Sequence, residues 1–129
     1  MVLNKTIAID LAKYGGEGYV EVGYPPLRKR ERFEQLATNL LTIYVDGRPT
    51  VQVGKALEAE KYRMLAYVES APFDLTPDGF YSFTDSLDAK VRGSGEQFYA
   101  DLREAIEKVK GGDTSPSPSS PAAENVSSE

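Results

Sequence analysis

The hydrophobic periodicity of the chain changes at Pro25 and Pro26. Before these prolines, apolar residues alternate with polar or small ones, which is the period of two that indicates a half-buried strand. Two such runs, residues 5–11 and 19–24, flank a segment in which three of the four positions 15–18 are glycine. The pattern predicts a β-hairpin with one apolar face. Because a lone hairpin is only marginally stable in water, other elements must cover that face.

After the prolines, apolar residues recur every three or four positions, which predicts helices. The first helix is expected to begin at the prolines and to run through Tyr44, before turn residues at 46–49 end it. Residues 50–54 form a short extended segment and a candidate third strand. A second helix is expected over residues 55–70.

Two more helices are expected near the C-terminus. Thr76 followed by Pro77 predicts the start of one that ends at Gly93. Ser94 followed by Gln97 reads as a capping box for the last helix, which ends near residue 110. The expected fold class is α+β: an N-terminal β-hairpin, with or without a third short strand, packed on about four α-helices.

The chain is expected to divide at residue 110. Residues 1–110 form one α+β interaction domain, of a common domain size. Residues 111–129 are rich in Ser, Pro and Ala and hold one large aliphatic residue, so we expect a disordered tail or linker.

Three residue types are missing from the sequence: Cys, His and Trp. Thiolate nucleophiles, disulfides, imidazole-bound metals and histidine-dependent triads are therefore excluded, and we expect neither an enzyme nor a cofactor. The formal net charge is -5, and residues 1–110 are close to electrical balance, so nucleic acid is not an expected partner. No apolar run is long enough for a signal peptide or a membrane span, which predicts a cytoplasmic protein.

Two groups of residues are candidates for binding a protein partner. The first is a basic cluster at the start of the first expected helix, formed by Arg28, Lys29, Arg30 and Arg32. It could dock an acidic surface, or it could be a solvated helix end balanced by Glu31 and Glu34. The second is a set of tyrosines beside the apolar stripes, which suits either an interface or the border of a core: Tyr19, Tyr67 and Tyr99.

A segment with the spacing of a calcium-binding loop begins at Asp74. Its oxygen-bearing side chains fall at loop positions 1, 3, 5, 9 and 12: Asp74, Thr76, Asp78, Ser82 and Asp85. Proline at the fourth position and aspartate at the twelfth argue against calcium, and the Thr76 helix start explains the same residues without metal.

The order of these signals resembles the tail assembly chaperones of long-tailed bacteriophages. The residues that carry the resemblance are the stretch 18–27, with its Tyr-Val-Glu-Val strand and Pro-Pro-Leu helix start, and the turn 46–49. The resemblance implies a non-enzymatic protein of the host cytoplasm that binds the tape-measure protein and other tail proteins and keeps the client soluble. Self-association is a further expectation. The alternatives are a structural or adaptor protein of a virion or other assembly, and a calcium-responsive module.

Overall fold

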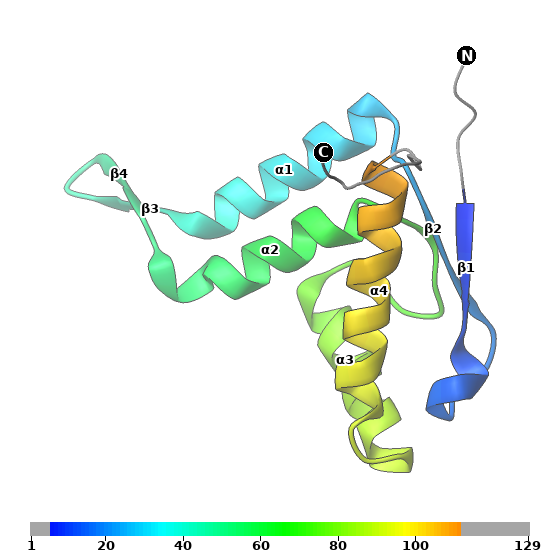
Figure 1. Ribbon diagram of the computed structural model, residues 1–129. Coiled ribbons are helices and arrows are strands. Elements are labelled where there is room, and N and C mark those ends of the chain that lie inside the picture. Colours follow the sequence, from blue (N-terminus) through cyan, green and yellow to red (C-terminus); the bar gives the residue numbers. More distant parts are fainter. Residues whose placement is uncertain (1–5, 112–129) are drawn as a thin grey trace, which may run out of the picture.

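The computed structural model describes residues 6–111 (Figure 1). Its N-terminal part is the expected hairpin, in which β1 (Thr6–Asp10) pairs antiparallel with β2 (Tyr19–Gly23). Ile7 lies opposite Val22 and Ile9 opposite Val20, so the alternating apolar residues share one face. The expected tail at residues 112–129 lies outside the described residues.

The connection between the two strands is longer than a tight turn. A short 3-10 helix, η1 (Leu11–Tyr14), follows β1, and the Ala12 amide donates a hydrogen bond to Asp10 Oδ1 at 3.0 Å. Gly15 and Gly18 have φ values of +87°, which only glycine adopts freely. The loop thereby buries Leu11 and Tyr14 beneath it.

A third strand completes the sheet, at a different place from the one expected. Strand β5 (Val68–Ser70) pairs antiparallel with β2, which gives the order β1-β2-β5. The helix expected over 55–70 was therefore wrong in its last turn, because α2 (Ala56–Leu65) ends earlier. Val68 is fully buried and the Gly23 amide donates to the Tyr67 carbonyl at 2.9 Å, so the extended backbone gains both packing and sheet pairing.

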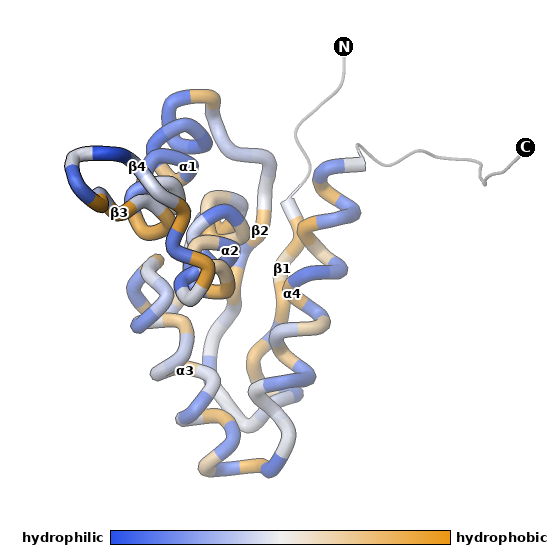
Figure 2. The backbone as a smooth tube through the Cα atoms, turned by 90° about the vertical axis from the view of Figure 1, so that its left-hand side faces the viewer, coloured by the Kyte–Doolittle hydropathy of each residue, from blue (hydrophilic) through white to orange (hydrophobic). Residues whose placement is uncertain are grey.

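An arm extends from this body, and it is built from two helices and a second hairpin (Figures 1 and 2). Helix α1 (Leu27–Leu41) runs outward and α2 returns beside it. At the tip, β3 (Thr42–Val45) pairs antiparallel with β4 (Arg48–Val51), and the short helix η2 (Val53–Lys55) leads back into α2.

Two predictions for the residues of the arm were wrong. Tyr44 was expected on the first helix, but the helix ends at Leu41 and Tyr44 lies in β3. Asp46 and Gly47 have φ values of +53° and +77°, which fit the two-residue turn that joins closely paired strands. The extended segment expected at 50–54 is strand only as far as Val51, and it pairs with β3 instead of the N-terminal sheet.

Two antiparallel helices, α3 (Pro77–Lys90) and α4 (Ser94–Lys110), pack against one another, and α4 covers the apolar face of the sheet. The Thr76 cap is confirmed, since Thr76 Oγ1 accepts a hydrogen bond from the Gly79 amide at 3.0 Å. The capping box was wrong: the cap of α4 is Gly93, in the left-handed conformation, and Ser94 is buried inside the first turn. Asp88 takes the capping role from α3, accepting from the Gly95 amide at 2.8 Å.

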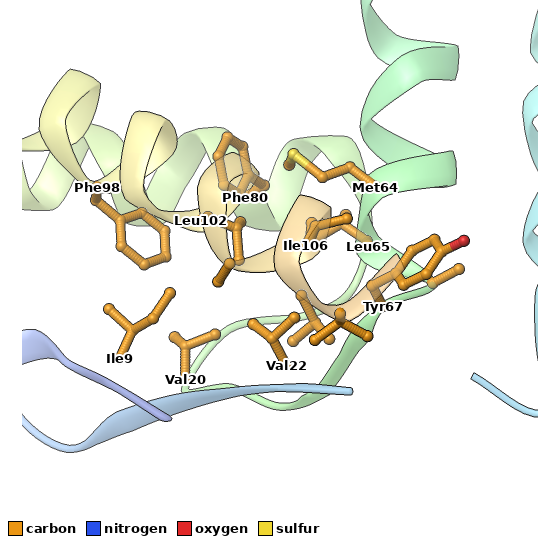
Figure 3. Packing of buried hydrophobic residues seen from close by; sticks show 14 of the residues in the cluster. Ile9, Val20, Val22, Met64, Leu65, Tyr67, Phe80, Phe98, Leu102 and Ile106 are labelled. Atoms are coloured by element: carbon orange, nitrogen blue, oxygen red, sulfur yellow. The ribbon is translucent and has the colours of Figure 1, made fainter. Parts of the chain in front are cut away.

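The main core lies between the sheet and α4 (Figure 3). Val20 and Val22 point from β2 toward Leu102 and Ile106 of α4, while Phe98 lies above Ile9. No helix within residues 6–111 is long and apolar enough to cross a membrane.

Candidate functional site

A groove lies where the base of the arm meets α4. It has a volume of about 580 Å³. Its walls come from the start of α1, the end of α2 and the C-terminal half of α4. The lining residues are Leu27, Arg30, Glu31, Glu34, Glu60, Arg63, Met64, Ala66, Tyr67, Arg103, Ile106, Glu107 and Lys110.

The floor of the groove is apolar and belongs to the edge of the core. Met64, Tyr67 and Ile106 lie close together in Figure 3, and each is at least nine-tenths buried. Leu27 stands at the rim and is 60% exposed, so it adds free apolar surface beside this floor. The groove thus offers an apolar contact that is continuous with packed, rigid structure.

The rim carries charges of both signs. Arg63 donates two hydrogen bonds to the Glu34 carboxylate, at 2.9 and 3.0 Å, and joins α2 to α1 across the top of the groove. These hydrogen bonds hold the pKa of Glu34 below its usual range. Lys110 and Glu107 form a looser pair on α4, at 3.7 Å. Four cationic and four anionic side chains line the groove, so its net charge favours neither an acidic nor a basic ligand.

Arg30 differs from the other rim residues. Its guanidinium lies over the ring of Tyr24, 5.4 Å from the ring centre. Its Nε is buried and has no hydrogen-bond acceptor within residues 6–111. A buried donor without a partner is costly. The Arg30 side chain as a whole is only partly buried, so its guanidinium can still meet a carboxylate or carbonyl oxygen of a ligand in the groove.

The structure divides the predicted basic cluster instead of presenting it as one patch. Lys29 donates a hydrogen bond to the Val68 carbonyl at 2.7 Å, and burial lowers its pKa despite the nearby Glu69. Arg28 and Arg32 are exposed and do not line the groove. Arg30 is therefore the only one of these four residues that lines the groove, and its side chain is partly buried there.

The three candidate tyrosines also separate. Tyr19 is 58% exposed on β2, whereas Tyr67 is buried beneath the Lys110 ammonium, which lies 5.3 Å from its ring centre. The half-buried Tyr99 packs against Lys61, whose Nζ is 4.7 Å from the ring centre. Of the three, Tyr67 lines the groove.

The calcium interpretation does not fit the geometry of its residues. Asp78, Ser82 and Asp85 lie on the continuous helix α3, where a wrapping loop would be needed, and Thr76 is engaged as the cap of that helix. Asp74 precedes the helix. Within residues 6–111, no group of three or more acidic side chains is arranged to hold a metal ion.

Sequence reasoning missed most of the groove. Met64 and Ile106 belong to apolar stripes and look like ordinary core residues, while Arg63 and Arg103 look like the solvated faces of their helices. Leu27 carried the one available signal, because it is a large apolar residue directly beside a basic cluster. The angle between the arm and α4, which brings these residues together, is not encoded in any local pattern.

Comparison of the chain with protein-family models, with curated proteins and with solved structures finds no match in any of the three.

Proposed function

We propose that this protein is a non-enzymatic assembly chaperone of the phage-tail type, which holds an amphipathic helical segment of a long client in the groove between α1, α2 and α4. The groove is the observation that carries the binding role. The client class, a tape-measure protein, rests on the resemblance of residues 18–27 and 46–49 to tail assembly chaperones.

The chemistry of the groove suits a helix. An amphipathic helix inserts apolar side chains spaced three and four residues apart into an apolar groove, and its polar flanks meet the rim. The floor formed by Met64, Tyr67 and Ile106 would receive these side chains. The mixed rim would pair with both signs of charge on the flanks of the client helix, which gives weak and repeatable contacts along a long client.

Arg30 provides the polar anchor in this arrangement. The partly exposed guanidinium would donate from its terminal nitrogens to a carboxylate of the client, and the Tyr24 ring beneath it holds the guanidinium in place. A charge-assisted hydrogen bond of this kind contributes about 1.5–3 kcal/mol, enough to weaken binding by a factor of ten or more when it is removed.

The test compares two matched charge reversals on the same helix. Arg30→Glu alters the groove, whereas Arg28→Glu makes the same change at an exposed position off the groove. Each full-length variant and the unaltered chain serve as bait in a lysate of the producing cells, with mass spectrometry of the recovered proteins and thermal melts to check folding.

We expect the unaltered chain and Arg28→Glu to recover the same very long, helix-rich protein, and Arg30→Glu to recover at least ten times less of it. Equal recovery by both variants would refute the groove as the binding site. Recovery of no helical client, together with detection of this chain in purified particles, would favour the structural adaptor instead.

A further inference from the structure

The outer end of the arm exposes large apolar side chains, which we call the tip surface. They are Ile43, Tyr44, Val45, Val51, Val53 and Leu57. Val53 is 78% exposed, Tyr44 72% and Val51 69%. Folded monomers rarely leave so many neighbouring apolar residues in water, and such a patch marks an interaction site.

The tip hairpin is uncovered on both faces within the described part of the chain. Tyr44 lies opposite Pro49 on one face, and Ile43 lies opposite Thr50 on the other. Every residue of β4 and all but the first of β3 are exposed. Because an isolated two-stranded hairpin is marginally stable, a partner that covers this one would stabilise it.

The two edges of the tip hairpin are not equivalent. In a hairpin closed by a two-residue turn, Val45 and Arg48 exchange the first pair of hydrogen bonds, so the next residues, Tyr44 and Pro49, direct their backbone groups outward. Pro49 has no amide hydrogen, which blocks strand addition at the β4 edge. The β3 edge remains open at the Tyr44 amide.

We propose that the tip surface is the interface of a two-fold dimer, in which the arm of one copy packs against the arm of a second copy of this chain. The exposed fractions of the six residues correspond to roughly 600 Å² of surface. A standard interface buries about 800 Å² on each partner, of which somewhat more than half is apolar. Tyr44 and Val51 lie on one face of the hairpin, and Ile43 and Val45 lie on the other. The tip surface therefore supplies the apolar part of a dimer interface when the second copy covers both faces.

The charges near the tip also favour a second copy. Asp46 and Arg48 flank the turn, and Lys55 forms an ion pair with Glu58 at 3.2 Å. The outer arm thus has no net charge that would select an acidic or a basic partner. Two copies of the arm can meet without the repulsion that two copies of a charged surface would experience.

The dimer does not depend on the proposed function, since the tip and the groove lie at opposite ends of the arm (Figure 1). If both proposals hold, a dimer presents two grooves to one long client. The second contact then becomes intramolecular, which raises the overall affinity without a new type of contact.

The first test measures the oligomeric state by sedimentation velocity over a concentration series of the full chain. We expect half-dimerisation in the micromolar range, as for other interfaces of modest area. Tyr44→Glu combined with Val51→Glu should raise the dissociation constant at least 100-fold. The control, Tyr19→Glu, alters another exposed tyrosine, 58% exposed on β2, and should leave the dissociation constant unchanged. A chain that stays monomeric up to millimolar concentration would overturn the proposal, as would a dimer that both variants form equally.

A second test uses the absence of cysteine from the sequence. Tyr44→Cys and Tyr19→Cys each introduce a single thiol at an exposed position. With a short bismaleimide, Tyr44→Cys should give a covalent dimer much faster than Tyr19→Cys. Equal rates would contradict an interface at the tip. Because these variants add no charge and remove no buried group, this comparison holds even if the glutamate variants fold poorly.

Discussion

The hydrogen bond between Tyr14 and Asp101 should hold the η1 loop onto α4, and its removal should lower the free energy of unfolding by about 1.5 kcal/mol. Tyr14 is 1% exposed, and its hydroxyl donates to Asp101 Oδ2 at 2.5 Å. Tyr14→Phe removes only the donor and keeps the edge-on contact with Phe98, 5.5 Å between ring centres. Hydrogen bonds to charged groups contribute about 1.5–3 kcal/mol, and the lower value applies because the Asp101 side chain is 23% exposed and can be rehydrated.

The loss of stability caused by Tyr14→Phe should become smaller at both low and high pH. The Tyr14 hydrogen bond holds the pKa of Asp101 below its usual range. The ionised Asp101 therefore adds its full stabilisation of the fold above the unfolded-state pKa of about 3.9, and this stabilisation is lost as the pH falls through the lower folded-state pKa. Burial raises the pKa of Tyr14, and the hydrogen bond to Asp101 raises it further. The neutral Tyr14 hydroxyl therefore adds its full stabilisation below the unfolded-state pKa of about 10, and this stabilisation is lost as the pH rises through the folded-state pKa. The stability difference between the two chains should therefore be constant from about pH 5 to 9 and shrink outside that range.

The assay is urea unfolding of the unaltered chain, Tyr14→Phe and Tyr19→Phe across this pH range. Tyr19→Phe is the control, since its side chain is 58% exposed. At pH 7 we expect Tyr14→Phe to unfold at a lower urea concentration and Tyr19→Phe to keep its midpoint. In a separate thermal melt, Tyr14→Phe should melt about 6 °C lower. A difference below 0.5 kcal/mol at pH 7, taken as roughly the scatter of neutral surface changes, would refute the reasoning, and so would a difference that stays the same down to about pH 2.

Three further changes probe the packing. Gly79→Ala would place a methyl group 2.4 Å from the Asp74 carbonyl oxygen and should lower the urea midpoint sharply, whereas Gly54→Ala, with open space around it, should leave the midpoint near its original value. Thr76→Ala removes the cap of α3 and should cost about 1 kcal/mol by the same assay; no loss would show that the cap contributes nothing. Phe98→Ala empties a fully buried position and should cost about 3–5 kcal/mol in calorimetry, and a cost below 1 kcal/mol would contradict its place at the centre of the core.

Local patterns predicted the elements whose cause is local. The alternation around Ile9 and Val20 predicted the first hairpin, and the Thr76–Pro77 start of α3 follows from cap and proline chemistry. The same patterns misplaced Tyr44 and Val68, because β-branched and aromatic residues next to a helical stripe fit either period. Their strand pairing with β4 and β2 decided the outcome, and pairing is a tertiary effect.

The groove could not be predicted from the sequence, for a related reason. Arg30 was selected for its charge, together with three neighbours that the fold sends elsewhere. Its distinguishing features are the buried Nε and the contact with Tyr24, a residue of the connection between β2 and α1, and both depend on how α1 packs on the body. Tyr67 was selected because it lies beside an apolar stripe, which suits either an interface or the border of a core. Its position on the floor follows from the turn between α2 and β5.

The most direct measurement is site-specific photo-cross-linking from the groove. A photoreactive amino acid replaces Leu27, which is 60% exposed at the rim, and in a separate chain replaces Tyr19, which is 58% exposed on β2. Each chain is expressed in the producing cells and irradiated during assembly. The account predicts covalent adducts with one long helical protein from position 27 and none from position 19. Adducts with that protein from position 19 alone would contradict it, as would the absence of any adduct from position 27.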